Sequence, residues 1–134
     1  MAGTYYNPDV APAAHEWLAL PELERIRLAL SYHLSARLKA PNMKAHATMH
    51  AAVENQIATG YGPSKRAVVR LQSEGLSRHE AIHAIASVVA QFIYEMNTGQ
   101  TAEQQTTSQS RMGEAIERLH AEQWLSSADG ASDG

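Results

Sequence analysis

Apolar residues recur at helical spacing along most of this chain, and no segment shows the sustained alternation of apolar and polar residues that predicts a strand. The clearest apolar face lies in Pro21–Lys39. It consists of Leu23, Ile26, Leu30, Leu34 and Leu38. A chain of 134 residues, of which 44% are hydrophobic, is long enough for one domain with a modest core. The sequence therefore predicts a single all-α domain.

Prolines, glycines and capping residues divide the chain into segments of helical length. Ser77 and Glu80 match the S-x-x-E capping box, which predicts a helix that begins there and runs to about Met96. The polar segment Gln100–Ser110 is expected to be a connector that is helical only in part. The other expected helices are Ala13–Leu20, Pro21–Lys39, Met43–Thr59, a short helix from Gly62 that Gly75 closes, and Arg111–Leu125. Together they predict a compact bundle of four to six helices with short loops.

The expected domain boundaries follow from the same breaks. We expect one domain over residues 1–126, which comprises an extended arm at 1–12, a core at 13–98 and a C-terminal helix at 111–125. The small polar residues of 127–134 predict a mobile tail.

Charge, cysteine content and hydropathy limit the classes of function. The formal net charge is -3, so no basic excess favours nucleic acid or an anionic membrane as a partner. The chain has no cysteine, so any metal ion must be held by nitrogen and oxygen ligands. No apolar run approaches the ~20 residues of a membrane helix, and residues 1–12 lack the features of a signal peptide. We therefore expect a cytoplasmic location.

Four of the seven histidines form two pairs, His46/His50 and His79/His83, and the members of each pair are four residues apart. On a helix this spacing places both imidazoles on one face, where they can share a metal ion. Glu54 continues the first row, and the apolar residues beside it predict that this row points into the protein. We therefore expect a divalent-metal site with these four histidines and Glu54 as candidate ligands, and zinc or iron as the ion.

Two catalytic patterns overlap with the histidine pairs. His79–His83 matches the H-E-x-x-H motif of zinc proteases, but Glu80 is already explained by the capping box. No strand is predicted that could align a peptide substrate. Glu80-x-x-His83 and Glu117-x-x-His120 match the repeat of di-iron bundles, although one half lacks a bridging glutamate. The sequence assigns neither a reaction nor a substrate.

The alternative hypothesis is a metal-free helical interaction or oligomerisation module whose buried histidines form a hydrogen-bond network. In that case the last helix or the aromatic residues near the two ends contact a protein partner or a second copy of the chain. These aromatic residues are Tyr5, Tyr6, Trp17 and Trp124. The same residues are equally explained by packing in the core.

Two further sets of polar residues are expected near the surface. The isolated histidines His15, His33 and His120 should lie at the surface or at the edge of the core. The basic residues near the fourth helix should form a solvated face, given the acidic balance of the chain. They are Lys65, Arg66, Arg70 and Arg78.

A longer series of residues spans both histidine pairs. It reads Pro41-Asn42, His46-x-x-x-His50, Glu54-Asn55-Gln56-Ile57-Ala58, Arg70-Leu71 and Glu74-Gly75-Leu76-x-Arg78-His79-Glu80-Ala81-Ile82-His83-Ala84-Ile85. This series resembles the bacterial family of domain of unknown function 1841, over about Pro41–Met96. The resemblance implies a bacterial origin and an all-helical fold, and the family has no assigned activity to carry over.

Overall fold

The computed structural model describes residues 5–36, 42–99 and 101–126, and helices are the only regular elements among them. Five of these helices have 12 residues or more. They are α2 (Glu22–Ser35), α3 (Met43–Ala58), α4 (Gly62–Ser73), α5 (Arg78–Met96) and α6 (Ala102–Glu117). Two short helices, α1 (Ala14–Ala19) and α7 (Ala121–Leu125), complete the described part. The all-α prediction is confirmed.

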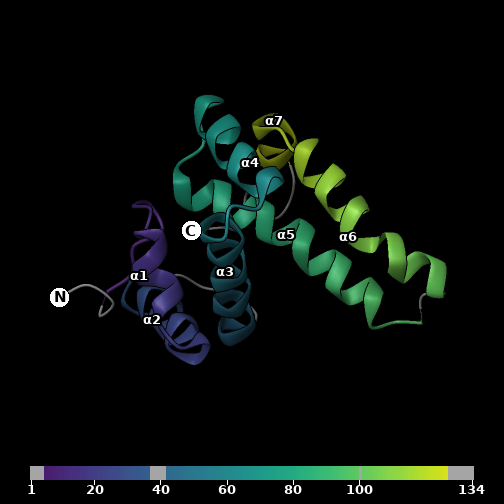
Figure 1. The fold of residues 1–134 in the computed structure, drawn as a ribbon. Helices are drawn as coiled ribbons and strands as arrows, with labels where there is room; N and C mark the ends of the chain where they lie inside the picture. The colour runs from purple at the N-terminus through teal and green to yellow at the C-terminus, as the bar shows by residue number, and fades with distance from the viewer. Residues whose placement is uncertain (1–4, 37–41, 100, 127–134) are drawn as a thin grey trace.

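Helix α3 occupies the centre of the bundle. It packs against α1 and α2 on one side and against α4 and α5 on the other (Figure 1). Helix α6 packs against α4 and α5, and α7 follows it near α4 (Figure 1). The third and fifth expected helices are therefore direct neighbours. None of the described helices combines the length and the apolar character needed to cross a membrane.

The start of α5 agrees with the sequence. Ser77 Oγ accepts a hydrogen bond from the backbone N–H of Glu80 at 3.0 Å, and the Glu80 carboxylate accepts one from the N–H of Ser77 at 2.9 Å. This reciprocal pair is the predicted capping box, and it satisfies two N–H groups that the helix itself leaves unpaired. Gly75 precedes it with a φ of 108°, as expected for a residue that closes the previous helix.

The polar connector predicted at Gln100–Ser110 is wrong for most of its length, because α6 begins at Ala102. Thr101 and Gln104 form a second capping box, and the sequence pattern T-x-x-Q matches that motif. The helix predicted over Arg111–Leu125 is interrupted between Glu117 and Ala121.

Two side chains explain this interruption. The Arg70 guanidinium donates to the carbonyls of Ile116 and Leu119, both at 2.9 Å, and thereby satisfies acceptors at the end of α6. The Glu74 carboxylate accepts from the backbone N–H of Ala121 at 2.8 Å, at the start of α7. Tertiary contacts from α4 therefore end one helix and begin the next.

The apolar face predicted for α2 is confirmed only in part: Ile26 and Leu30 are partly buried against a core cluster, but Leu23 and Leu34 are not buried. Leu23 is 81% exposed and Leu34 is 61% exposed, whereas Leu28, Ala29 and His33 are buried. The helix is rotated so that the face bearing His33 points inward. Leu38 and Lys39, at the end of that prediction, lie outside the described residues, as does the predicted tail at 127–134.

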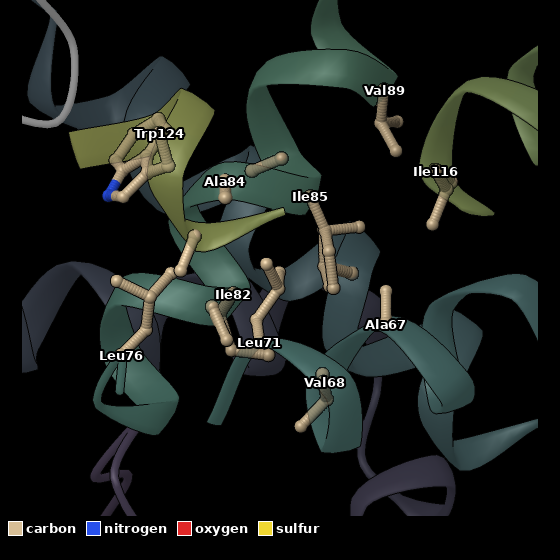
Figure 2. Close-up of a cluster of buried hydrophobic side chains, with 14 residues drawn as sticks. Ala67, Val68, Leu71, Leu76, Ile82, Ala84, Ile85, Val89, Ile116 and Trp124 are labelled. Atoms are coloured by element: carbon tan, nitrogen blue, oxygen red, sulfur yellow. The ribbon is translucent and has the colours of Figure 1, made fainter. Parts of the chain in front are cut away.

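The main hydrophobic core lies between α3, α4, α5, α6 and α7. Figure 2 shows Leu71 of α4 against Ile82 and Ile85 of α5, with Ile116 of α6 and Trp124 of α7 closing the cluster. The first four of these side chains are fully buried. Burying one such side chain stabilises the fold by about 1.5–3 kcal/mol, so this cluster accounts for the packing of the last four helices.

A second, smaller cluster lies between α1, α2, α3 and the arm. It contains Tyr6, Trp17, Leu28, Ala29, Ala47 and Ala51. Trp17 is 3% exposed, and its indole N–H donates to Asn55 of α3 at 2.9 Å. Of the four aromatic residues near the ends, Tyr6, Trp17 and Trp124 are buried in the core, and Tyr5 is exposed.

Candidate metal centre

The two predicted histidine rows face each other across the interface between α3 and α5. The imidazole centroids of His46 and His83 are 4.6 Å apart, and those of His50 and His79 are 5.1 Å apart. Within α3, His46 and His50 are separated by 4.6 Å. The spacing of four residues on each helix therefore brings all four predicted histidines into one cluster.

His33 of α2 joins this cluster, which corrects its predicted place at the surface or core edge. It is fully buried, and its ring centroid lies 4.6 Å from those of both His46 and His50. His15 and His120 are exposed, as expected. His33 follows the buried Ala29 by four residues. The sequence pattern that could have predicted its burial is therefore the helical face formed by Leu28, Ala29 and His33.

The five histidines divide into two groups of potential metal ligands that share His50. The outer group consists of His46, His50 and His83, and the inner group consists of His33, His50 and His79. Within each group, one nitrogen from each ring lies within 4.8 Å of the others. Three nitrogens around a tetrahedral zinc ion lie about 3.4 Å apart, given Zn–N bonds of about 2.1 Å, so the rings need only small movements to bind one.

His50 is the central residue of the cluster. It is fully buried, and neither of its ring nitrogens has a hydrogen-bond partner among the described residues. Burial lowers the pKa of His50 well below its usual value, and the surrounding imidazoles of His33, His46, His79 and His83 lower it further. The ring is therefore neutral at physiological pH, which is the form that binds metals.

The outer group lies beside a pocket that reaches the surface. Its volume is about 230 Å³, and its lining includes His46, His50 and His83. The rest of the lining is uncharged and is formed by Asn42, Ala45, Met49, Ala86, Ser87 and Ala90. All three inner-group residues are buried, and this pocket reaches only His50 among them. The two groups thus differ in their access to solvent.

Glu54, the fifth predicted ligand, belongs to neither group. Its Oε1 accepts from Arg78 Nη2 at 2.9 Å, and its Oε2 accepts from Arg78 Nη1 at 2.7 Å and from the hydroxyl of Tyr6 at 2.6 Å. Both carboxylate oxygens therefore already have partners. Burial raises the pKa of Tyr6 well above its usual value, and the charge of Glu54 and the hydrogen bond to it raise it further.

Arg78 does not lie on the predicted solvated face. Its side chain is only 6% exposed and forms a bidentate ion pair with Glu54, which is 1% exposed. Burial by itself lowers the pKa of Arg78, but the hydrogen bond and charge of Glu54 outweigh it and raise the pKa overall. The guanidinium also donates to the carbonyl of Pro8 at 2.9 Å, and the Asp9 carboxylate accepts from the backbone N–H of His79 at 3.0 Å. The arm is thus fixed beside the inner group.

The geometry separates the residues of the H-E-x-x-H motif. His79 belongs to the inner group and His83 to the outer group, so the two are not members of one set of three. The Glu80 carboxylate is engaged in the capping box. A protease site needs both histidines on one ion and the glutamate beside it, and this arrangement does not provide that.

The second half of the di-iron pattern lies elsewhere. The Glu117 carboxylate accepts from the guanidinium of Arg66 at 2.6 Å, and His120 Nδ1 lies 2.9 Å from a Glu74 oxygen. These pairs are on the surface side of α4, α6 and α7, and neither residue belongs to the two histidine groups. The two E-x-x-H segments therefore do not build one common site.

Both groups offer only imidazole nitrogens. Neutral imidazole suits zinc, copper, nickel and iron, whereas magnesium and calcium prefer oxygen ligands. Because neither group contains a carboxylate, a bound divalent ion would keep its full charge. Such a donor set fits a transition-metal ion.

Comparisons with protein-family models, curated proteins and solved structures found no match to this chain. The resemblance to domain of unknown function 1841 over about Pro41–Met96 therefore stays a prediction, as does the bacterial origin that it implies.

Proposed function

We propose that this protein binds a divalent transition-metal ion through His46, His50 and His83. The observation that supports the proposal is the convergence of these three imidazoles, from α3 and α5, with one nitrogen of each within 4.8 Å of the others. His50 strengthens it, because a fully buried imidazole with no hydrogen-bond partner among the described residues is destabilising by about 1–3 kcal/mol. A bound ion supplies the missing partner.

Zinc is the ion that this ligand set favours over iron. In a site of nitrogen ligands, affinity rises along the series from iron(II) to copper(II), and zinc(II) binds more tightly than iron(II). Glu54 is not part of the proposed ligand set, since both of its oxygens contact Arg78 or Tyr6. Its role is instead to hold the start of α5, and with it His79, in place.

The pocket beside the three histidines supports a site that exchanges ligands. Three protein ligands with an open position are typical of catalytic zinc, whereas four are typical of structural zinc. The pocket of about 230 Å³ has room for a water molecule or another small ligand next to the ion. The proposed site therefore binds an ion that a small molecule can reach.

The test is the zinc content of the untagged chain, purified without chelator, together with zinc titration of the metal-free protein. We expect at least one equivalent of zinc per chain in the wild type and none in His50→Gln. At a free zinc concentration about 100 times the Kd, binding should stabilise the wild type against urea by about 2.7 kcal/mol.

His15→Gln is the matched control, because His15 is exposed and outside both groups. It should retain the zinc content and the stabilisation of the wild type. A wild-type protein that contains no zinc, and that added zinc, copper, nickel or iron does not stabilise, would overturn the proposal.

The second candidate function is the helical interaction module, without a metal ion. The observation that favours it is the exposure of large apolar side chains on α2 and α5. Leu23 and Leu34 are 81% and 61% exposed, and Tyr94 is 69% exposed. In this hypothesis these faces contact a second copy or a protein partner, and a monomer at all concentrations in analytical ultracentrifugation would contradict self-association.

A further inference from the structure

The inner group has the composition of a metal site in its own right. His33, His50 and His79 come from three different helices, α2, α3 and α5, and all three are buried. One nitrogen of each lies within 4.8 Å of the others, as in the outer group. The proposed function uses only the outer group, so it gives no role to His33 or His79.

The His33 ring is already oriented for binding. Its Nδ1 lies 2.7 Å from the carbonyl oxygen of Ala29, and a carbonyl only accepts, so Nδ1 carries the proton. In the neutral ring, the lone pair is then on Nε2. A histidine whose other N–H donates to a backbone carbonyl is the usual form of a metal ligand, because that bond fixes the tautomer and the ring orientation.

The number of nitrogens points to a shared ligand. Two ions with three protein ligands each need six nitrogens, and the two groups contain five histidines. The sixth nitrogen is available only if one ring uses both of its nitrogens. His50 is the residue common to both groups, and both of its nitrogens are buried without a hydrogen-bond partner among the described residues.

We propose that His33, His50 and His79 form a second transition-metal site, and that His50 bridges the inner and outer ions with one ring nitrogen on each. The inference rests on the proposed function, since it adds a second ion, held by the inner group, beside the ion in the outer site.

The bridge requires one proton to leave. When the first nitrogen of neutral His50 binds an ion, the other still carries its hydrogen. Binding of the second ion displaces this proton to solvent, so the ring becomes an imidazolate with two coordinate bonds, and no electrons are transferred. The anion lowers the total charge of two divalent ions from four to three. Among the described members of both groups, the imidazolate is the only anion that would offset the charge of the two ions, because both groups consist of histidines alone and the Glu54 carboxylate is paired with Arg78.

Copper(II) titration of the metal-free protein tests the bridge directly. We expect two equivalents per chain in the wild type. Two copper(II) ions joined by an imidazolate couple magnetically. The integrated electron paramagnetic resonance signal at liquid-helium temperature should therefore rise up to one equivalent and fall to less than half of that maximum at two. This measurement needs no variant.

Variants at the unshared histidines assign the two sites. His33→Gln should remove only the inner ion and His83→Gln only the outer ion, so each should bind one equivalent with an uncoupled signal. His15→Gln is the control and should bind two equivalents. Far-UV circular dichroism of each metal-free variant checks that it is folded.

The outcomes separate this inference from the proposed function. One equivalent in the wild type, retained by His33→Gln and lost by His83→Gln, overturns the second site and leaves the outer site standing. Two equivalents whose signals add without coupling overturn the bridge. No binding in the wild type overturns both proposals.

Discussion

Helices α3 and α5 each contribute to two interiors that differ in chemistry. Toward α4, α6 and α7 they present Val53, Ile82 and Ile85, which are fully buried in an aliphatic core. Toward α2 and each other they present four imidazoles, which meet His33 of α2, together with an ion pair between Glu54 and Arg78. The aliphatic core is explained by the removal of apolar surface from water alone. The removal of apolar surface does not explain the polar interior, because each of its groups is costly to bury without a partner.

The residues of the aliphatic core stabilise the fold by their burial, whereas the histidines of the polar interior are held in place by the fold at a cost in stability. Leu71 and Ile85 contribute through burial, and nothing about them indicates a ligand. His50 is equally buried and lacks hydrogen-bond partners among the described residues, so its burial is unfavourable unless an ion binds. Glu54 and Arg78 compensate each other, and they connect α3, α5 and the arm.

The largest effect is expected from separating the buried ion pair in the polar interior. Arg78→Met should lower the free energy of unfolding by about 3–5 kcal/mol, because it leaves the Glu54 carboxylate buried without its cation. Urea unfolding of the metal-free protein measures this. Arg78→Met/Glu54→Leu should recover most of the loss, since no buried charge remains.

The matched control is Arg66→Met, which removes an arginine from an exposed pair with Glu117. The urea concentration at the midpoint of unfolding of this variant should equal that of the wild type within experimental error. If the two arginine variants have the same effect, the loss of the cation beside the buried Glu54 carboxylate costs no more than the loss of an exposed ion pair.

A truncation in the aliphatic core should have the next largest effect. Leu71→Ala should lower the free energy of unfolding by about 3 kcal/mol, because it removes buried methyl groups and leaves a cavity. The number of zinc ions bound per folded chain should not change. A loss of zinc binding in Leu71→Ala at a temperature where the variant is folded would mean that the two interiors are not independent.

The smallest effect concerns the pH dependence of the metal-free protein. Burial, and then the neighbouring imidazoles, hold the pKa of His50 well below the ordinary value of 6.5, so the unfolded chain binds a proton there that the folded chain does not. The stability contributed by neutral His50 is present above pH 6.5 and is lost as the pH falls from 6.5 toward the lowered pKa. His50 contributes at most about 1.4 kcal/mol per pH unit to the slope of the free energy of unfolding against pH.

His50→Leu should flatten this slope by removing one titrating group. The imidazoles of His33, His46, His79 and His83 face the same site and are present in both proteins. Urea unfolding between pH 5 and 7 (roughly the range of histidine titration) compares the two proteins. An unchanged slope in His50→Leu would mean that His50 does not stay neutral in the folded protein.

The sequence was sufficient for the features that depend on spacing within one helix. The rows of His46/His50 and His79/His83, and the capping box at Ser77, follow from distances of three or four residues along the chain. It was not sufficient where the partner lies on another helix or on the arm. Glu54 has the spacing of a further ligand on the His46/His50 row, but its partners Arg78 and Tyr6 are 24 and 48 residues away.

His33 illustrates a second limit. The leucines of α2 form the stronger periodic pattern, yet Leu23 and Leu34 are exposed and His33 is buried. Hydropathy alone favours the leucine face. The buried face was decided by what α3 and α5 present to α2, which includes imidazoles as well as the small apolar residues Ala47 and Ala51.

The contacts of the arm also constrain the order in which this protein can assemble on the ribosome. Pro8 and Asp9 contact Arg78 and His79, which are synthesised 70 residues later. Helices α2 and α3 can pair earlier, and this pairing already brings His33 together with His46 and His50. Contacts between such distant residues form late because a long loop must close first. The nascent chain therefore exposes three of its five clustered imidazoles before the arm and α5 cover them, so His33 and His50 of the inner group are open to solvent and its metal ions during synthesis.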